Sequence, residues 1–160
     1  MRSFELKVKI KKLYDSAIIP TRGSVEAAGY DLYANWAQGD GDSGGELGTE
    51  TIGPHKTVKF GTGIAMEIPS GCFGAVFARS GLATKQGLRP SNCVGVIDAD
   101  YRGEIIVALH NDTNKPQTVK FGDRIAQLVI MPFYGVLFDV VEELEETDRG
   151  SGGFGSTGTK

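Results

Sequence analysis

Apolar and polar residues alternate along short stretches of this chain, which is typical of β-strands with one buried face. Apolar and basic residues nearly alternate over residues 6–13, and residues 64–68 (IAMEI) repeat the period of two. Other short runs are rich in Val, Ile and Phe and are separated by Gly, Pro, Asn or Asp. These predicted strands cover residues 58–60, 71–78, 93–97, 104–109, 125–133 and 136–141, and AGYDLYA at 28–34 forms another apparent strand.

Helical periodicity is nearly absent from the sequence. One helical turn is predicted at residues 80–86, where a Ser-Gly entry is followed by Leu, Ala, Thr and Lys. Short strands at this spacing, separated by many glycines, predict an all-β sandwich or jelly roll with one short helical turn.

Two segments depart from the strand pattern. Residues 38–53 are packed with Gly, Asp, Ser, Glu and Thr, and they predict an exposed, mobile loop inserted between strands. Residues 142–148 (EELEETD) form an acidic run that reads as a solvated linker. Such a linker would let the residues after it move away from the body of the protein.

Length and composition restrict the classes of protein to which the chain can belong. Its 160 residues, 40% of them hydrophobic, suit one domain with a real core. A net charge of −3 argues against binding along a nucleic-acid backbone, because that binding neutralises many phosphates. Cys72 and Cys93 have no metal-type spacing and are expected to be reduced thiols. With neither a secretory signal nor a bilayer-length apolar stretch, we expect a soluble intracellular protein without a membrane partner.

The glycine-rich stretch at residues 149–158 (RGSGGFGSTG) has the composition of a ligand-binding loop. Its glycines let backbone N–H groups approach a ligand, while Arg149, Ser156 and Thr157 offer donors for phosphate oxygens. Phe154 offers a flat face on which a base can stack. The alternative is a disordered Gly/Ser terminus, and the stretch alone leaves both interpretations open.

Two further candidates for a functional site lie upstream, and only the second of them is suited to binding an anion. Asp31 stands in the middle of an apparent strand, where a carboxylate is either a solvent-facing filler or a group held at a site. Arg79, Ser80 and Gly81 stand where a predicted strand gives way to the helical turn, an arrangement that supplies a guanidinium, a hydroxyl and free backbone N–H groups. The same tripeptide also fits an ordinary helix cap with a surface arginine.

Two more stretches contain polar residues suited to chemistry. In GVIDADYRGEI (residues 95–105), Asp98 emerges from an apolar run and is expected to be fixed and partly desolvated, as a base that activates water must be. The alternative is a plain Asp-rich turn. In FGDRIAQLVI (residues 121–130), Gln127 is a polar residue within an apolar strand, and its amide is expected to contact either a ligand or backbone.

Taken in order, AGYDL, RSGLA, GVIDADYRG, GDRIAQL and RGSGGFGSTG closely resemble the five motifs of the trimeric dUTP pyrophosphatases, or dUTPases. The resemblance extends from about Leu6 to Gly158. The chain departs from the family in Ala78, where a proline is common, and in the longer segment at residues 38–53. By this resemblance residues 1–148 form a single β domain and residues 149–160 form an arm that closes over the nucleotide.

The resemblance implies a jelly-roll homotrimer with active sites shared between subunits. Its reaction would be Mg²⁺-dependent hydrolysis of dUTP to dUMP and pyrophosphate, which keeps uracil out of DNA and supplies dUMP for thymidylate synthesis. Asp98 would be the general base that activates the attacking water. Tyr101 would lie beneath the deoxyribose and exclude a 2′-hydroxyl, and Asn92 would read the uracil edge with help from backbone groups of a hairpin at residues 92–105.

The remaining site residues also follow from the resemblance. Gln127 would lie near the α-phosphate, and Asp31 would reach the metal only through water, so no protein group would bind Mg²⁺ directly. Phe154 would stack on uracil. The other implied nucleotide contacts are Arg79, Ser80, Gly81, Gly95, Arg149, Gly155, Ser156 and Thr157.

Two other functions were considered for the same motifs. A dCTP deaminase would need a glutamate in the strand EIIVALHND, where this chain has Ala108, and we therefore reject deamination. The other rival is a nucleotide-binding relative of the dCTP deaminase and dUTPase superfamily that has lost turnover. A cytoplasmic location is expected, and the sequence does not exclude a nuclear pool.

Overall fold

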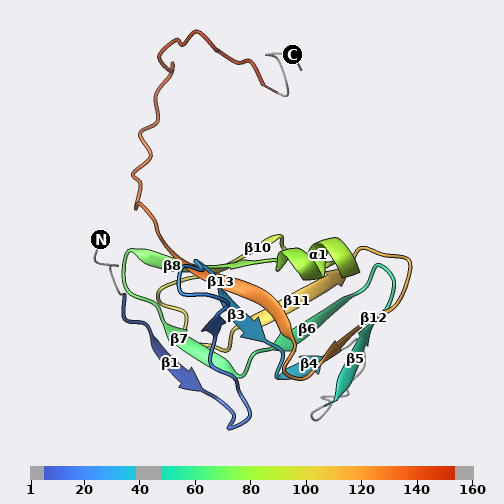
Figure 1. Ribbon diagram of the computed structural model, residues 1–160. Helices are drawn as coiled ribbons and strands as arrows, with labels where there is room; N and C mark the ends of the chain where they lie inside the picture. The colour runs from blue at the N-terminus through green and yellow to red at the C-terminus, as the bar shows by residue number, and fades with distance from the viewer. Residues whose placement is uncertain (1–5, 39–47, 154–160) are drawn as a thin grey trace.

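The structure, a computed structural model, describes residues 6–38 and 48–153. Strands dominate it, with one helix in the described residues (Figure 1). The elements are β1 (Lys9–Lys12), β2 (Thr21–Arg22), β3 (Tyr30–Tyr33), β4 (Trp36–Gln38), β5 (Thr49–Ile52), β6 (Thr57–Gly61), β7 (Ile64–Glu67), β8 (Cys72–Phe77), α1 (Ser80–Gln86), β9 (Leu88–Pro90), β10 (Val94–Ile97), β11 (Ile106–Asn111), β12 (Gln117–Lys120) and β13 (Arg124–Pro132).

Two larger sheets form the body of the molecule. One has the strand order β10-β8-β13-β3-β2 and the other has the order β4-β6-β11-β9. Two-stranded sheets, β1-β7 and β12-β5, complete the fold. Every pair is antiparallel, and many neighbours are distant in sequence, which is the connectivity expected of a jelly roll. The predicted all-β fold is confirmed.

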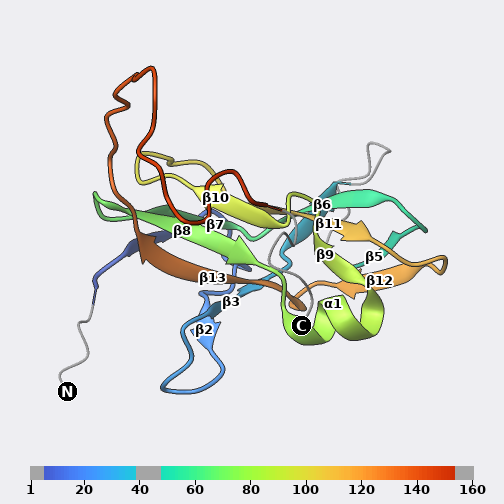
Figure 2. The ribbon, with the colours of Figure 1, turned by 90° about the horizontal axis from the view of Figure 1, so that it is seen from above.

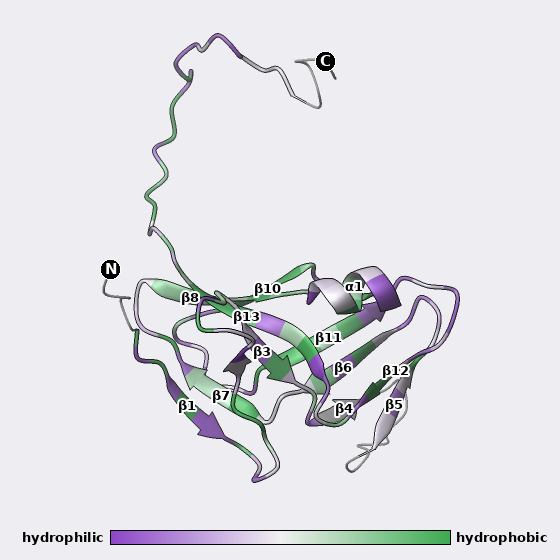
Figure 3. Cartoon of the chain, in the orientation of Figure 1, coloured by the Kyte–Doolittle hydropathy of each residue, from purple (hydrophilic) through white to green (hydrophobic). Residues whose placement is uncertain are grey.

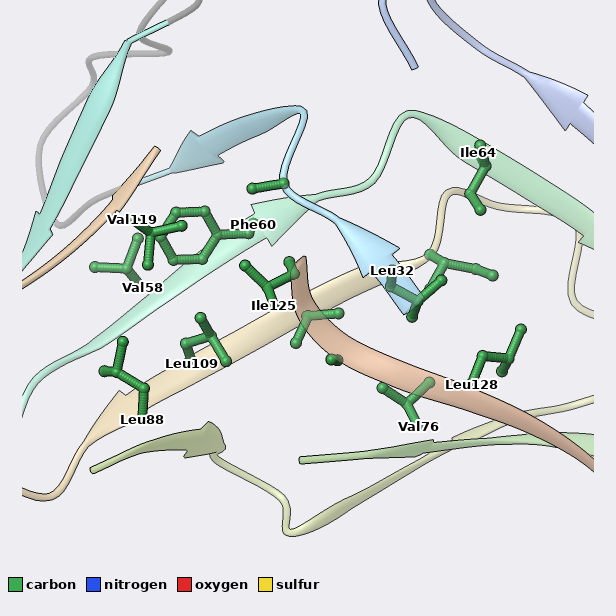
Figure 4. Packing of buried hydrophobic residues seen from close by; sticks show 14 of the residues in the cluster. Leu32, Val58, Phe60, Ile64, Val76, Leu88, Leu109, Val119, Ile125 and Leu128 are labelled. Atoms are coloured by element: carbon green, nitrogen blue, oxygen red, sulfur yellow. The ribbon is translucent and has the colours of Figure 1, made fainter. Parts of the chain in front are cut away.

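The core lies between the two larger sheets (Figure 4). Leu32, Val76 and Leu128 reach into it from the five-stranded sheet, and Phe60 and Leu109 reach into it from the four-stranded sheet. All five are buried, and each buried side chain of this size stabilises the fold by roughly 1.5–3 kcal/mol. The strands that carry these five residues, β3, β6, β8, β11 and β13, were all expected from the sequence.

The predicted helical turn at residues 80–86 is confirmed as α1. Arg79 occupies the N-cap position with an extended backbone, and its side chain makes no capping hydrogen bond. The helix ends at Gly87, whose left-handed φ of 65° lets its N–H group return to the carbonyls of Leu82 and Ala83. This seven-residue helix falls short of the length and apolarity that crossing a membrane requires, and it is the one helix in the described residues.

One predicted boundary and one predicted strand are wrong. The loop expected at residues 38–53 ends before β5, because Thr49–Ile52 pairs with β12 and buries the side chain of Ile52 completely. Residues 39–47 lie outside the described residues. The strand expected at residues 136–141 does not form, because that segment leaves the body after β13 and finds no strand to pair with in the described chain (Figures 1 and 2).

Candidate functional site

A polar cleft of about 420 Å³ lies where β8 ends and α1 begins, beside β3 and β13. The cleft gathers residues from three of the stretches singled out in the sequence: AGYDL, RSGLA and GDRIAQL. Five predicted site residues line it: Asp31, Arg79, Ser80, Gly81 and Gln127. Sheet pairing explains the gathering, because β13 lies between β3 and β8 and carries Gln127 opposite both Asp31 and Phe77.

Asp31 holds two arginines at the cleft. Its Oδ1 accepts a hydrogen bond from Arg79 Nε at 2.7 Å, and its Oδ2 accepts one from Arg124 Nη1 at 3.3 Å. The Asp31 side chain is 13% exposed, so it is neither a solvent-facing filler nor fully buried. Two guanidinium groups against one carboxylate leave the cleft with a net positive charge, which suits a polyphosphate.

Arg79 is more than a surface arginine at a helix cap. Besides its ion pair with Asp31, its Nη1 donates to the carbonyl of Arg124 at 3.3 Å, so the guanidinium is fixed at the cleft. Arg124 received no role in the sequence analysis. Its place in GDRIAQL, one residue after the turn formed by Gly122 and Asp123, was the signal that could have identified it.

Gln127 is oriented by its neighbours. Its Nε2 donates to the carbonyl of Ala78 at 2.9 Å. Of the two partners expected for this amide, a ligand or backbone, the single chain therefore shows backbone. Gly29 provides the space for this amide, because a Cβ atom at Gly29 would lie 2.6 Å from Gln127 Oε1. Gln127 and Gly29 both line the cleft, so the oriented amide is also within reach of a ligand there.

The chemistry of this cleft fits a metal ion held by its ligand rather than by the protein. No group of three or more His, Cys, Asp or Glu residues suited to a metal ion occurs in the described ranges. Among the described residues that line the cleft, Asp31 is the single carboxylate, and each of its oxygens already accepts from an arginine. A Mg²⁺ ion here would need phosphate oxygens and water for most of its coordination.

The stretch GVIDADYRG places its polar residues elsewhere. Asp98 follows β10 and is exposed, so the expected partial desolvation of this carboxylate is wrong for the single chain. Tyr101 donates from its backbone N–H to the Asp98 carbonyl and from its hydroxyl to the Glu104 carbonyl at 2.9 Å. This loop is compact, but its Asp98 side chain faces solvent.

The hairpin expected at residues 92–105 is also wrong. Strand β10, which includes Gly95, pairs with β8, whereas β11 pairs with β6 and β9 in the other sheet. The segment between them is therefore a crossover between sheets. Asn92 is exposed and lies outside this crossover, just before β10.

Asp98 lies far from the cleft of its own chain. Val94 is opposite Phe77 and Ile97 is opposite Gly74, so Asp98 follows at the level of Phe73. Arg79 lies six residues further along the chain from that level, which corresponds to about 20 Å of extended backbone. The single chain thus separates the predicted base from the positively charged cleft.

Arg149 is exposed and does not line this cleft. Its Nε donates to the Gly152 carbonyl at 2.8 Å within a local turn. Phe154, Gly155, Ser156 and Thr157 lie outside the described residues.

Comparisons with known proteins agree with the family resemblance of the sequence. Residues 45–158 match the dUTPase family model. The deoxyuridine 5′-triphosphate nucleotidohydrolase of Desulfitobacterium hafniense is 47% identical over 159 residues, which cover 99% of each chain. The enzyme of that name from Syntrophotalea carbinolica is 46% identical over 153 residues, covering 96% of this chain and 97% of its own.

A solved structure shows the same fold. A mutant dUTPase of Staphylococcus bacteriophage 80alpha with dUpNHpp superposes with a TM-score of 0.80 at 28% identity, covering 95% of this chain and 98% of its own. Sequence and structure therefore agree over nearly the whole chain. It belongs to the dUTPase family.

Proposed function

We propose that this protein hydrolyses dUTP to dUMP and pyrophosphate, with the nucleotide's phosphates bound in the cleft of Arg79 and Arg124. The activity follows from family membership, because relatives matched over nearly the full chain are named deoxyuridine 5′-triphosphate nucleotidohydrolases. The observation that carries the assignment to this cleft is the pair of guanidinium groups held by Asp31 beside Gln127. Such a fixed positive site favours a triphosphate over an uncharged ligand.

In the proposed reaction, a water oxygen attacks the α-phosphorus and the bond from that phosphorus to the bridging oxygen of the β-phosphate breaks. The Asp98 carboxylate accepts the proton of the water, and pyrophosphate leaves with the electrons of the broken bond. Arg79 and Arg124 stabilise the negative charge that develops on the departing phosphates. Gln127 orients the α-phosphate through its side-chain amide, which the hydrogen bond to the Ala78 carbonyl holds in place.

We further propose that two chains contribute to each site. The extended backbone of about 20 Å between the level of Asp98 and Arg79 supports this, because one triphosphate cannot contact both groups of the same chain. A closed homotrimer would present the Asp98 loop of one subunit to the cleft of its neighbour at three equivalent sites. Packing against a neighbour would also exclude water from Asp98.

Mg²⁺ would accompany the triphosphate and neutralise part of its charge. The cleft residues fit a hydrated Mg²⁺ ion, because the Asp31 carboxylate would contact the ion only through one of its water ligands. Its two arginine bonds make it first of all the group that fixes Arg79.

The base and sugar are assigned to the stretch from Asn92 to Tyr101, which includes β10. Asn92 reads the uracil edge beside Gly95, and Tyr101 packs under the deoxyribose, with its hydroxyl anchored to Glu104 so that the ring position is fixed. The arm at residues 149–160 closes over the bound nucleotide, with Phe154 on the base and Arg149, Gly155, Ser156 and Thr157 at the phosphates. Ser80 and Gly81 contact phosphate from the start of α1.

The test is pyrophosphate release from dUTP, dCTP, dTTP and UTP, each with and without Mg²⁺. We expect rapid Mg²⁺-dependent release from dUTP and at least about a hundredfold lower kcat/KM for the other three. Tight dUTP binding without release would indicate the binding relative that lacks turnover. Equal release from all four nucleotides would contradict the assigned specificity.

A further inference from the structure

Residues 90–93 form a tight turn that contains Asn92 and connects one sheet to the other. Strand β9 before the turn belongs to the four-stranded sheet, and β10 after it belongs to the five-stranded sheet. The Cys93 N–H donates to the Pro90 carbonyl at 3.0 Å, and the Val94 N–H donates to the Asn92 carbonyl at 2.7 Å. Cys93 has a φ of 63°, a left-handed conformation that is unfavourable for a residue with a side chain. The shape of this turn therefore needs support from its surroundings.

Arg89, the middle residue of β9, supplies that support. Its Nη1 approaches the carbonyls of Pro90 and Ser91 at 3.3 and 3.5 Å and the Cys93 thiol at 3.9 Å. One guanidinium edge thus contacts the turn on both sides of Asn92.

Asp112 fixes the guanidinium in place. Arg89 Nε donates to Asp112 Oδ2 at 2.8 Å, and Arg89 Nη2 donates to Asp112 Oδ1 at 3.0 Å. This is the two-bond geometry in which an arginine and a carboxylate fix each other's orientation. The bonds to Asp112 raise the pKa of Arg89 further above its ordinary value, so the guanidinium stays charged. Asp112 directly follows β11, so the ion pair ties the turn to the central strands.

We propose that Arg89 and Asp112 are positioning residues that hold the Asn92 turn in the conformation required for base recognition. This inference rests on the proposed function, in which Asn92 reads the uracil edge. The Asn92 amide already lies close to Gly95, where a Cβ atom would come within 3.5 Å of Asn92 Nδ2. A shift of the turn would misplace this amide relative to a base, because hydrogen bonds weaken steeply with distance and angle.

Steady-state kinetics of the full-length protein tests the proposal with variants Arg89→Met, Arg89→Lys and Asp112→Asn. We expect Arg89→Met to raise KM for dUTP about tenfold with kcat within about twofold, because base binding weakens while Asp98 and the phosphate cleft are untouched. Arg89→Lys should be intermediate, since an ammonium cannot hold the carboxylate and the turn in the same two-bond geometry. The double variant Arg89→Met with Asp112→Asn should lose no more than Arg89→Met alone, because the pair acts as a unit.

The matched control is Lys9→Met, which breaks a different exposed ion pair, the 2.9 Å contact of Lys9 with Glu67. It should leave KM and kcat unchanged. An unchanged KM in Arg89→Met, or a fall in kcat alone, would overturn the proposal.

Amide hydrogen exchange makes the test independent of turnover. In Arg89→Met the Cys93 amide should exchange at least about tenfold faster than in the unmodified protein, while the amides of β8 keep their rates. Unchanged exchange at the Cys93 amide would contradict the proposal that Arg89 holds the turn, even if KM rises. If the unmodified protein fails to hydrolyse dUTP, the proposed function fails, and the exchange measurement still decides whether Arg89 shapes the turn.

Discussion

Asp98 and Asn111 show how differently single polar residues are used in this chain. Asp98 is exposed after β10 and belongs to the proposed chemistry, whereas Asn111 is fully buried at the end of β11. The Asn111 Nδ2 donates to the carbonyls of Ile52, Gly53 and Lys115 at 2.9, 3.1 and 2.8 Å. One side chain thus ties β11 to β5 and to the loop that follows β11.

Asp98→Asn should lower kcat by at least about a hundredfold, because the amide cannot accept the proton of the attacking water. Nucleotide binding should persist, since the arginine cleft is unchanged. Pyrophosphate release and equilibrium binding of dUTP, measured on the same sample, check this. Near-normal turnover would remove Asp98 from the mechanism.

Asn111→Ala should destabilise the protein by about 3 kcal/mol, because it leaves several buried backbone carbonyls without their donor. Urea unfolding followed by circular dichroism measures the change. Asn114→Ala is the control: Asn114 is exposed and bonds only the His55 ring among the contacts described, so its loss should have little effect. Equal losses in the two variants would contradict the structural role of Asn111.

Among the elements, strands with strong alternation could be predicted from sequence and short polar strands could not. Residues 6–13 and 64–68 contain β1 and β7, and the runs around β6, β8, β10, β11 and β13 were also predicted. In contrast, β5 reads TETI and becomes a strand because it pairs with β12, a partner more than sixty residues away in the sequence. Pairing of this kind depends on the whole fold and leaves no local pattern.

Residues 136–141 show the opposite error. Their apolar composition predicted a strand, yet Leu137, Phe138 and Val140 are more than 90% exposed. Figure 3 shows hydrophobic residues along this segment, well away from the body. Apolar composition indicates that a segment becomes buried, but it does not indicate whether the covering surface belongs to the same chain.

Helix α1 depends on Gly87 at its end. Gly87→Ala should destabilise the protein by about 2 kcal/mol, because φ at this position is 65° and an added Cβ atom would collide with Thr113 Cγ2. Gly81→Ala in the same helix has open space around its Cβ position and should be neutral or stabilising by roughly 0.5–1 kcal/mol. Unfolding in urea compares the two. A similar sign for both substitutions would contradict the assigned helix end.

Over the molecule as a unit, five residues that line the cleft could be singled out from the sequence, but their arrangement could not. The cleft residues Asp31, Arg79 and Gln127 meet because β3, β13 and β8 are neighbours. Asp98 stays apart because β10 runs antiparallel to β8 and ends near Phe73. Arg124 stands in GDRIAQL, but only the pairing of β13 with β3 reveals its contact with Asp31.

We propose that dUTP hydrolysis needs Asp98 from one chain and Arg79 from another. Two inactive proteins, Asp98→Asn and Arg79→Gln, are to be unfolded, mixed in equal amounts and refolded together, and pyrophosphate release from dUTP is then measured. Random assembly of trimers should restore about a quarter of the unmodified activity, because some sites receive both intact groups. Each variant refolded alone should stay inactive. A mixture as inactive as its parents, although mixed trimers form, would contradict a site shared between chains.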